Sequence, residues 1–292
     1  MEPSAAELLF LNGEIMPLRE GRVSVEDRGF QFADGVYEVM RVCSGRVFRL
    51  KAHLDRLERS ASGIHLPLEY DASALERICG ELLAQSQLRS GTIYIQVTRG
   101  ASRRVYLPSS ESIRPTTVVY TRALEGLSRQ AWEAGLTLIS RLDDRWARCD
   151  LKTIALLANV LAKIEANRRG ADEVVFYGSD GTVYECGSSN VYAVIHGEVF
   201  THPESPKILN GITRMAIREV CRAQRIDFHE TPKTLQDFLQ AQEVFGSSTT
   251  RDSFPIVAID GQAIGAGRPG PLTRRIWEAY RALLERETSH LP

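Results

Sequence analysis

Alternating hydrophobic and polar positions predict strands in many parts of the chain. The clearest case is 92–98, where isoleucine or valine at 93, 95 and 97 alternates with tyrosine, glutamine and threonine. Because successive side chains of a strand point to opposite faces, this alternation predicts a half-buried strand. Similar segments, several bounded by turn formers such as Asn12-Gly13, predict strands over 8–11, 36–42, 47–50, 116–121, 136–140, 173–177, 182–184, 190–195, 199–201, 243–246 and 255–259.

Hydrophobic residues three or four positions apart predict helices. The spacing of Leu54 and Leu57, and of Leu75, Ile78 and Leu82, is typical of helices with one buried face. The predicted helices cover about 51–61, 72–88, 154–169, 212–224 and 272–286. Strands occur in hairpins more than in alternation with helices. The pattern therefore predicts an α+β protein with mixed and antiparallel sheets and packed helices, not a doubly wound fold.

The length of 292 residues predicts about two domains. The segment 123–130 has no clear period and contains Glu125-Gly126. It is therefore the predicted linker between a smaller N-terminal α+β domain, 1–122, and a larger C-terminal domain, 131–292.

Composition and charge exclude several classes of protein. Net charge is −1, so no overall basic field attracts nucleic acid or an acidic membrane surface. The longest stretch without Asp, Glu, Lys or Arg holds 12 residues, too few to span a bilayer, and no basic segment followed by an apolar run predicts a secretory signal. No two of the 5 cysteines have CxxC spacing, so neither a zinc site nor a disulfide scaffold is expected. We expect a reduced, cytoplasmic protein that holds no metal.

Lys152 is one of only 5 lysines among 36 basic side chains, and it precedes the apolar run 154–157. Removing an amine from water disfavours its charged form, which makes it available as a nucleophile or a base. Such an amine can form a Schiff base with an aldehyde cofactor. Taken alone, a solvated lysine at a helix start is the simpler interpretation.

Three further segments carry candidate polar groups. Glu185 precedes the small-residue segment 187–190, where a carboxylate could pair with a pyridinium nitrogen. Segment 209–214 leads into a predicted helix, whose first amides and Thr213 hydroxyl could bind phosphate. Segment 246–250 is rich in hydroxyls and could complete that site. Each has an ordinary alternative: a loop glutamate, helix capping and a turn at a strand end.

Together, in this order, these segments resemble the fold-type IV pyridoxal-phosphate aminotransferases, and among them the D-amino-acid aminotransferases most closely. The matching stretches span about 10–260 in unbroken order. They are Glu26-Asp27-Arg28-Gly29-Phe30-Gln31-Phe32-Ala33-Asp34-Gly35-Val36-Tyr37-Glu38-Val39, His53-Leu54-Asp55-Arg56-Leu57, Val97-Thr98-Arg99-Gly100, Arg148-Cys149-Asp150-Leu151-Lys152, Glu185 with Gly187-Ser188-Ser189-Asn190, Gly211-Ile212-Thr213-Arg214 and Ser248-Thr249-Thr250.

The resemblance implies a role for each candidate residue. Lys152 would hold pyridoxal 5′-phosphate covalently and move the proton between the substrate α-carbon and the cofactor. Glu185 would bind the pyridine nitrogen, and Leu209 would lie against the ring. The phosphate would be bound by Arg56, Ile212, Thr213, Ser248 and Thr249. A guanidinium fork and helix-end amides suit a dianionic phosphate.

The substrate side is the part that departs from the family. Tyr37 would line it and help to bind the α-carboxylate. The family loop carries an Arg-x-His pair that reaches into the partner subunit's site, and here Arg104 aligns with the arginine and Tyr106 with the histidine. A tyrosine donates a hydrogen bond but has no positive charge near neutral pH, and the adjoining Arg103 could compensate. Without the resemblance, a solvated basic loop would explain both arginines.

The resemblance implies a homodimer with shared active sites that transfers the amino group of a D-amino acid, of D-alanine type, to a 2-oxo acid. Three other activities of the same fold stay open: branched-chain L-amino-acid aminotransferase, aminodeoxychorismate lyase and (R)-amine transaminase. The run Asp34 to Val39 favours the D-amino-acid enzyme, whereas Tyr106 is also compatible with the lyase. A cofactor-binding protein without turnover is a fourth alternative, but binding alone does not require both Lys152 and Glu185.

Overall fold

The computed structural model describes residues 7–107 and 113–289. The chain divides into two compact units. Unit 1 is made of the described residues of Met1–Glu125, Leu151–Ala155 and Glu285–Pro292, and unit 2 of Gly126–Asp150 and Leu156–Leu284. The two units are therefore not the two consecutive stretches of the chain that the sequence predicts. Residues 151–155, which include Lys152, belong to unit 1 together with the N-terminal part of the chain.

Unit 1 is built on a six-stranded sheet within the described residues, and every neighbouring pair of strands is antiparallel. In spatial order the strands are β2 (Glu14–Pro17), β1 (Leu8–Leu11), β6 (Thr116–Ala123), β5 (Gly91–Thr98), β3 (Gly35–Cys43) and β4 (Arg46–Val47). The alternation predicted for 92–98 is confirmed, since Ile93, Ile95 and Val97 are buried.

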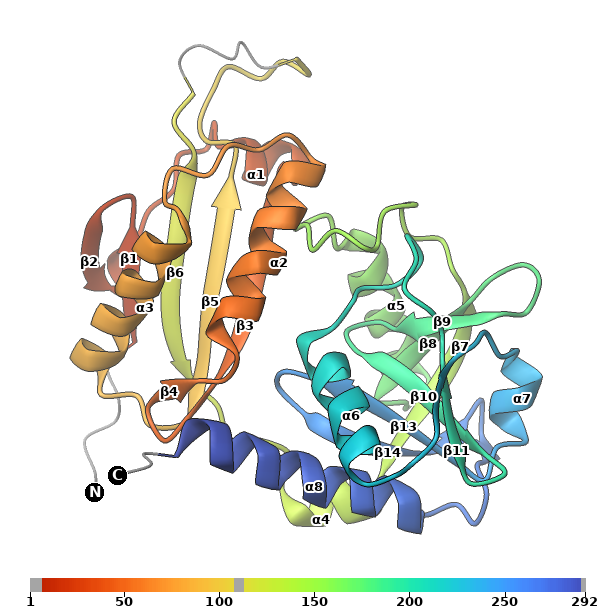
Figure 1. Ribbon diagram of the computed structural model, residues 1–292. Helices are drawn as coiled ribbons and strands as arrows, with labels where there is room; N and C mark the ends of the chain where they lie inside the picture. The colour runs from red at the N-terminus through yellow and green to blue at the C-terminus, as the bar shows by residue number, and fades with distance from the viewer. Residues whose placement is uncertain (1–6, 108–112, 290–292) are drawn as a thin grey trace. The chain divides into compact units, whose positions relative to one another are not determined.

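The core of unit 1 lies between this sheet and the helices α2 (Leu50–Gly63) and α3 (Ala72–Ser86), which cover one face of it (Figure 1). Alternate residues of β3 and β5 point into this core. The fully packed members include Val36, Met40, Leu54, Leu57, Leu75, Leu82, Ile93 and Ile95. Each such side chain contributes about 1.5–3 kcal/mol by leaving water. Two short helices, η1 (Leu18–Glu20) and α1 (Arg28–Phe32), precede β3.

Unit 2 contains a mixed sheet of nine strands among the described residues. Its order is β12 (Phe228–Glu230), β11 (Glu198–Thr201), β10 (Asn190–Ile195), β13 (Glu243–Ser248), β14 (Asp252–Ile259), β7 (Leu136–Leu142), β8 (Glu173–Tyr177) and β9 (Val183–Cys186), with β15 (Gln262–Ala263) beside β14. The pairs β14–β7, β7–β8 and β11–β12 are parallel and the others antiparallel. The predicted class, α+β with mixed and antiparallel sheets, is confirmed.

Helices complete unit 2. They are α4 (Arg129–Ala134), α5 (Leu157–Arg168), α6 (Ile212–Ala223), α7 (Leu235–Leu239) and α8 (Pro271–Thr288), whose last residues group with unit 1. Ala162 and Ala166 of α5 pack on Val174 and Phe176 of β8. In the described residues, no helix combines the length and the apolar character that crossing a membrane requires.

Some predicted boundaries are wrong for local reasons. The expected strand 47–50 ends at Val47, because Arg49 adopts a left-handed conformation (φ 52°) and α2 begins at Leu50. The expected linker 123–130 contains the start of α4, whose first turn is capped by the Ser128 hydroxyl accepting from the Ala131 amide. The helix expected over 154–169 begins only at Leu157.

Candidate functional site

Lys152 lies in an extended segment beside β3, not at the start of a helix as the sequence indicated. The Tyr37 amide donates to the Lys152 carbonyl (2.9 Å), and the Ile154 amide donates to the Gly35 carbonyl (3.1 Å). The Lys152 amide donates to the Ser60 hydroxyl (3.0 Å). A side chain at Gly35 would clash with its neighbours, since a Cβ there would be 2.7 Å from the Val97 carbonyl oxygen. The backbone of Lys152 is therefore fixed from both sides.

The side chain of Lys152 is only partly buried and lies over an aromatic ring. Its Nζ is 4.2 Å from the centroid of the Tyr37 ring. Tyr37 stacks on Tyr94 at 5.7 Å, and Tyr94 stacks on Tyr120 at 4.8 Å. An ammonium over an aromatic face gains about 0.5–2 kcal/mol. The structure thus brings the predicted catalytic lysine and the predicted substrate-side tyrosine together.

Arg56 belongs to a buried ionic cluster between α2 and β3. Its Nε donates to Glu38 Oε1 (2.7 Å) and its Nη2 to Glu38 Oε2 (2.8 Å). His53 Nδ1 lies 2.8 Å from the same Oε2. All three side chains are almost completely buried. A two-point fork between a guanidinium and a carboxylate fixes the plane of Arg56.

The charges in this cluster shift two pKa values. Burial by itself would raise the pKa of Glu38, but the Arg56 charge and its hydrogen bonds, with that of His53, lower it to about 2. Burial lowers the pKa of His53, against the opposing effect of Glu38. The cluster therefore contains a carboxylate and a guanidinium at neutral pH, with His53 favoured in its neutral form.

Glu185 lies in β9 and is buried, so it is not the loop glutamate that the sequence offered as the ordinary alternative. Arg145 Nη1 donates to its Oε1 (2.6 Å). Asn190 Nδ2 (3.2 Å) and the Leu209 amide (3.0 Å) donate to its Oε2. Burial would lower the pKa of Arg145, but Glu185 and Asp143 raise it. These donors hold a carboxylate at one defined position in unit 2.

The N-terminus of α6 lies next to that carboxylate. The helix begins at Ile212 as the sequence predicts, and its N-cap is Gly211, which provides no side chain to bond the first amides. A Cβ at Gly211 would be 2.3 Å from Asn190 Oδ1, so a side chain there would displace Asn190. Uncapped amides and the positive end of the helix dipole favour an anion at this position. Ile212 and Thr213 are buried in the first turn.

Ser248 and Thr249 lie at the end of β13, in the same part of unit 2. Asn190, which donates to Glu185, pairs with Ser247 across β10 and β13. Ser248 is the next residue along β13. The Ser248 hydroxyl accepts from the Arg251 amide (3.2 Å), which fixes the turn. Glu185, Leu209 and the residue before α6 thus meet at Asn190, and Ser247 of β13 pairs with it.

Arg104 and Tyr106 lie on an exposed loop of unit 1. The Tyr106 side chain is 86% exposed, and its ring centroid is 5.7 Å from that of Phe32. The Arg104 guanidinium carbon is 4.8 Å from the same Phe32 centroid. The segment from Ala101 to Pro108 carries Arg104 and Tyr106, and Pro108 lies outside the described residues.

The candidate residues thus form two sets. Unit 1 carries Tyr37, Arg56, Arg104, Tyr106 and Lys152. Unit 2 carries Glu185, Leu209, Ile212, Thr213, Ser248 and Thr249.

Glu38, Arg145 and Asn190 are among the residues that received no role from the sequence but contact predicted ones, and His53 contacts Glu38. The position of Glu38 could have been noticed in the sequence. It shares the buried face of the predicted strand with Val36 and Met40, and a buried carboxylate requires a charged or hydrogen-bonding partner. For Arg145, no spacing in the sequence predicts its contact with a residue 40 positions away.

Comparisons with known proteins identify the family of the chain. The profile of the family described as "Amino-transferase class IV" matches residues 35–259. The D-alanine aminotransferase of Bacillus licheniformis is 38% identical over 281 residues, covering 96% of this chain and 98% of that protein. The D-alanine aminotransferase of Staphylococcus aureus (strain N315) is 38% identical over 279 residues, covering 96% and 98%.

Solved structures resemble the whole chain. The branched-chain amino acid aminotransferase of Escherichia coli has a TM-score of 0.90 at 25% identity, covering 98% of this chain and 97% of that one. The T.th. branched-chain enzyme, solved with pyridoxamine 5′-phosphate, has a TM-score of 0.89 at 27% identity, covering 98% and 96%.

The chain belongs to the class IV aminotransferases, and it is an aminotransferase of fold type IV. Enzymes of this fold type use pyridoxal 5′-phosphate. The expected substrates of such an enzyme are an amino acid and a 2-oxo acid.

Proposed function

We propose that this enzyme transfers the amino group of a D-amino acid, of D-alanine type, to a 2-oxo acid with pyridoxal 5′-phosphate as cofactor. The observation that carries the proposal is the 38% identity to D-alanine aminotransferases over 96% of the chain. The mechanism is ping-pong, in which the first product leaves before the 2-oxo acid binds.

The donor groups of the two sets fit this cofactor. Lys152 provides an amine for its aldehyde, and Glu185 provides a fixed carboxylate for its ring nitrogen, with Leu209 against the ring. The uncapped start of α6 with Ile212 and Thr213, together with Arg56, Ser248 and Thr249, suits its phosphate. When bound, the cofactor supplies the carbonyl that takes up the amino group and the ring that stabilises charge at the substrate α-carbon.

The residues of the chain perform the proton transfers. Lys152 moves a proton between the substrate α-carbon and C4′ of the cofactor, which requires one basic and mobile amine. Its fixed backbone and the adjacent Tyr37 ring limit where this amine reaches. Glu185 keeps a proton on the ring nitrogen, because a carboxylate partner favours the charged ring.

A second candidate donor is a branched-chain L-amino acid. The solved structures that resemble this chain include branched-chain aminotransferases, with TM-scores of 0.90 and 0.89. Their sequence identities of 25% and 27% are lower than the 38% of the D-alanine enzymes, so we favour the D-amino acid.

Half-reactions of the purified holoenzyme test the choice. D-alanine, L-leucine, D-glutamate and (R)-1-phenylethylamine are added singly and the cofactor absorbance is followed. We expect D-alanine to react fastest by kcat/KM. Preference for L-leucine would establish the branched-chain alternative, and preference for the amine the (R)-amine transaminase. Release of pyruvate from aminodeoxychorismate would establish the lyase.

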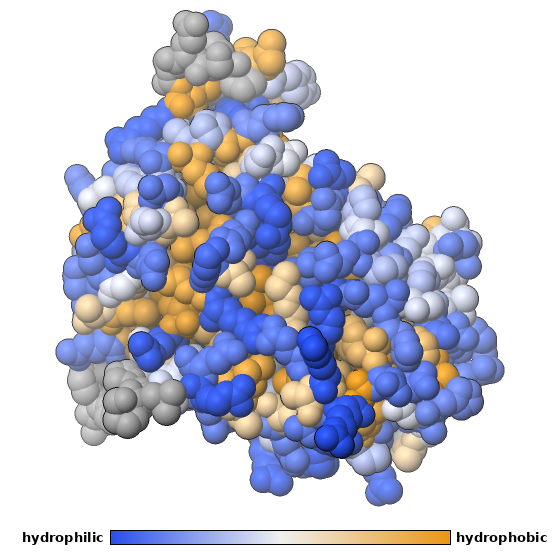
Figure 2. Space-filling model, viewed as in Figure 1, coloured by the Kyte–Doolittle hydropathy of each residue, from blue (hydrophilic) through white to orange (hydrophobic). Residues whose placement is uncertain are grey.

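Exposed hydrophobic side chains support a homodimer. In unit 1, Phe30 is 78%, Tyr106 86% and Leu107 86% exposed, and Figure 2 shows hydrophobic surface at the top of the view. In unit 2, Leu157, Leu161 and Ile164 are exposed at a spacing that places them on one face of α5. Exposed apolar patches mark interaction surfaces. The dimer partner would receive the loop that carries Arg104.

Free thiols support a cytoplasmic location. All five cysteines are free, and burial raises the pKa of Cys79 and of Cys221 to about 12. Thiols of this kind react slowly and have no disulfide partner. We place the enzyme in the reducing cytoplasm on this basis.

Replacement of Arg104 by alanine is expected to weaken substrate carboxylate binding. A charged hydrogen bond contributes about 1.5–3 kcal/mol, so kcat/KM for D-alanine should fall roughly 10- to 150-fold. Tyr106→Phe should cost less, because only a neutral donor is lost. Steady-state kinetics with D-alanine and with an amine that lacks a carboxylate measure the effect. An equal loss on both substrates would contradict the carboxylate-binding role.

The same variant tests whether the site is shared. Mixing Arg104→Ala and Lys152→Ala subunits should restore part of the activity, because one hybrid site then carries both residues. An active monomer at assay concentration, shown by light scattering, would exclude a shared site.

Glu185→Gln is expected to retain cofactor but to slow the half-reaction with D-alanine by more than about tenfold, or 1.4 kcal/mol. Glutamine keeps the shape of the side chain but cannot stabilise a charged ring nitrogen. Stopped-flow absorbance gives the rate, and equilibrium titration with pyridoxal 5′-phosphate gives the affinity. Glu198→Gln, which removes an exposed carboxylate beside His229 in the same unit, is the control. A wild-type rate in Glu185→Gln would assign the role to another group.

A further inference from the structure

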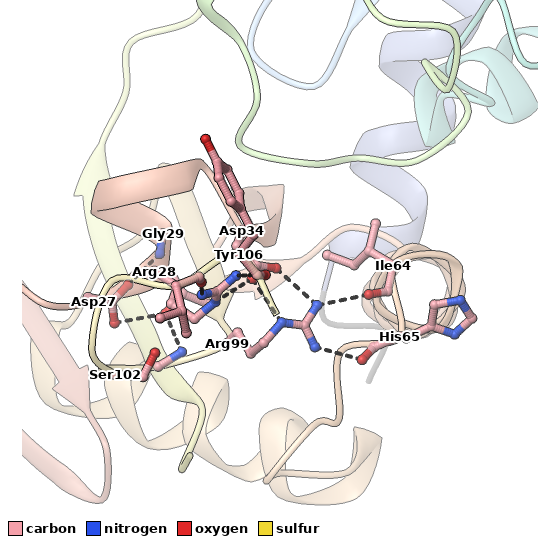
Figure 3. A network of polar contacts seen from close by, with 12 residues as sticks. Asp27, Arg28, Gly29, Asp34, Ile64, His65, Arg99, Ser102 and Tyr106 are labelled. Atoms are coloured by element: carbon pink, nitrogen blue, oxygen red, sulfur yellow. Dashed lines mark hydrogen bonds and ion pairs between the residues drawn. The ribbon is translucent and has the colours of Figure 1, made fainter. Parts of the chain in front are cut away.

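Arg28 is a buried arginine whose donors reach three acceptor groups. It is the first residue of α1 and only 4% exposed. Its Nε donates to Asp34 Oδ2 (2.8 Å), its Nη1 to the Val105 carbonyl (2.6 Å) and its Nη2 to the Tyr106 carbonyl (3.2 Å) (Figure 3). A guanidinium has its donors in a fixed plane, so these contacts fix the peptide groups at 105 and 106 relative to α1.

Asp34 orients this guanidinium and also binds a second arginine. Arg99 donates through Nε to Asp34 Oδ2 (2.8 Å) and through Nη2 to Oδ1 (3.0 Å). Arg99 also donates to the Ile64 and His65 carbonyls, at 2.9 and 2.7 Å (Figure 3). One carboxylate thus serves two arginines, of which one holds 105–106 and the other holds the end of α2.

Asp34 remains ionised in this setting. Burial would raise its pKa, but the hydrogen bonds and charges of Arg99 and Arg28 lower it. The arrangement of two guanidinia around one carboxylate is therefore stable at neutral pH.

The first part of the loop is anchored by its backbone to the segment before α1. The Arg28 amide donates to the Gly100 carbonyl (2.9 Å), and the Ser102 amide donates to the Glu26 carbonyl (3.1 Å). Asp27 forms a β-bridge with Ala101. These bonds end at 102, so the Arg28 side chain provides the contacts at 105 and 106.

The side chains of this loop point the other way. The Tyr106 ring extends away from Arg28 and Asp34 (Figure 3) and is 86% exposed. Arg104 is also exposed, over the Phe32 ring. The backbone is thus held from inside unit 1 while the two side chains with the proposed recognition role are presented outward.

We propose that Arg28, oriented by Asp34, is a positioning residue for substrate recognition. It holds the 105–106 backbone so that Arg104 and Tyr106 meet the substrate carboxylate at a defined place. Arg28 itself does not touch the substrate. The inference rests on the proposed function, which assigns carboxylate binding to Arg104 and Tyr106.

Arg28→Lys and Arg99→Lys form a matched pair of variants. Both lose a guanidinium that donates from Nε to the same Asp34 oxygen, and both keep the positive charge. A lysine ammonium cannot bridge a carboxylate and two successive carbonyls. Arg28→Lys removes the guanidinium contacts to the 105 and 106 carbonyls. Arg99→Lys instead removes the contacts to the 64 and 65 carbonyls. A purely structural role predicts similar behaviour for both.

Two measurements on the holoenzyme test the inference. For Arg28→Lys we expect KM for D-alanine to rise about 10-fold with kcat changed less than about 3-fold, since small misplacements of recognition groups are costly. Amide hydrogen exchange of peptides covering 101–107 should become faster. Arg99→Lys should leave KM for D-alanine and the exchange rate of these peptides within about 2-fold of the wild-type values. In the Arg104→Ala background, Arg28→Lys should raise KM clearly less than it does alone, because the part of its effect that acts through Arg104 is already lost and only the smaller part through Tyr106 remains.

Equal effects of the two lysine variants on KM, or unchanged exchange at 101–107 in Arg28→Lys, would overturn the inference. So would a full additional effect in the Arg104→Ala background. If Arg104→Ala leaves KM unchanged while exchange at 101–107 still rises in Arg28→Lys, the recognition role proposed for Arg104 fails and the anchoring by Arg28 stands. If Arg28→Lys does not fold, Arg28→Gln, which has fewer donors, replaces it, and its KM and its exchange at 101–107 are compared with those of Arg99→Lys.

Discussion

Replacement of Lys152 by alanine is expected to lower kcat roughly 10²- to 10⁴-fold, the contribution of a positioned acid–base group. The cofactor should still bind, because the groups proposed for its phosphate and ring nitrogen are elsewhere: Arg56 in α2, Glu185 in β9 and the start of α6. The expected result is therefore a protein that retains pyridoxal 5′-phosphate in equilibrium dialysis but turns over slowly.

Two observations connect this loss to Lys152 specifically. Borohydride reduction of wild-type holoenzyme followed by peptide mapping should place the cofactor on Lys152 among the 5 lysines. Lys51→Ala, which removes a lysine whose side chain is 87% exposed and pairs with the exposed Asp55, should leave kcat within about 2-fold. Small primary amines added to Lys152→Ala should restore part of the rate.

A label on another lysine would refute the assignment. A Lys152→Ala enzyme with kcat near that of wild type would show that a different base moves the proton. Loss of cofactor together with loss of activity would mean that Lys152 acts mainly in binding.

Some buried strands could be predicted because short runs of β-branched and aromatic residues between turn formers are typical of strands. The limits expected for β8, 173–177, and β10, 190–195, are those observed. Their residues are buried on both faces, or nearly so, and turn formers bound them. By contrast, α1 and α7 have five residues each, too few to show a helical period.

The surroundings of Lys152 show where prediction from the sequence ends. The apolar run 154–157 suggested a helix starting at 154, but Thr153 pairs with Val36 of β3 and delays α5 to Leu157. This pairing joins residues more than 100 positions apart, and tertiary contacts of that kind override local propensity. The apolar contact of the lysine comes instead from the Tyr37 ring, which local pattern could not reveal.

For the proposed cofactor set, the resemblance names the residues, but the sequence does not show what holds them in place. Arg56 is assigned through the resemblance alone, and spacing leaves Glu185 and Thr213 each with an ordinary alternative. Their partners Glu38, Arg145 and Asn190 act through pairings set by the tertiary fold. These partners decide how rigid the candidate site is, as the Glu38–Arg56 pair illustrates.

Glu38→Gln is expected to destabilise unit 1 by about 3–5 kcal/mol, the typical cost of breaking a buried ion pair by removing one partner. Glutamine has nearly the same volume, so the loss is electrostatic: Arg56 loses the charged partner that fixes its guanidinium. Affinity for pyridoxal 5′-phosphate should fall too, if Arg56 binds the phosphate. Lys51→Ala, which breaks the exposed Lys51–Asp55 pair on the same helix, should cost less than about 1 kcal/mol.

The measurement of the Glu38→Gln effect requires a probe of unfolding that reports on unit 1 alone. The three tryptophans, Trp132, Trp146 and Trp277, all belong to unit 2, so their fluorescence monitors the other unit. Hydrogen exchange of peptides covering 35–43 and 50–63 follows β3 and α2 during urea unfolding. Slower or unchanged exchange of these peptides in Glu38→Gln would contradict a stabilising pair.

The pH dependence gives the sharpest test of this cluster, because the sign follows from the two shifts. The pKa of Glu38 falls from 4.5 to about 2 on folding, so its stabilisation, on the order of 3 kcal/mol, is complete above pH 4.5 and is lost as the pH falls towards 2. The lowered pKa of His53 acts in the same direction, since the unfolded chain takes up a proton below about 6.5 that the folded chain resists. The unfolding free energy of wild-type unit 1 should therefore fall in two steps between pH 7 and 2, and Glu38→Gln should lack the lower step. Parallel curves for the two proteins below pH 4.5 would show that Glu38 does not carry the charge that holds Arg56.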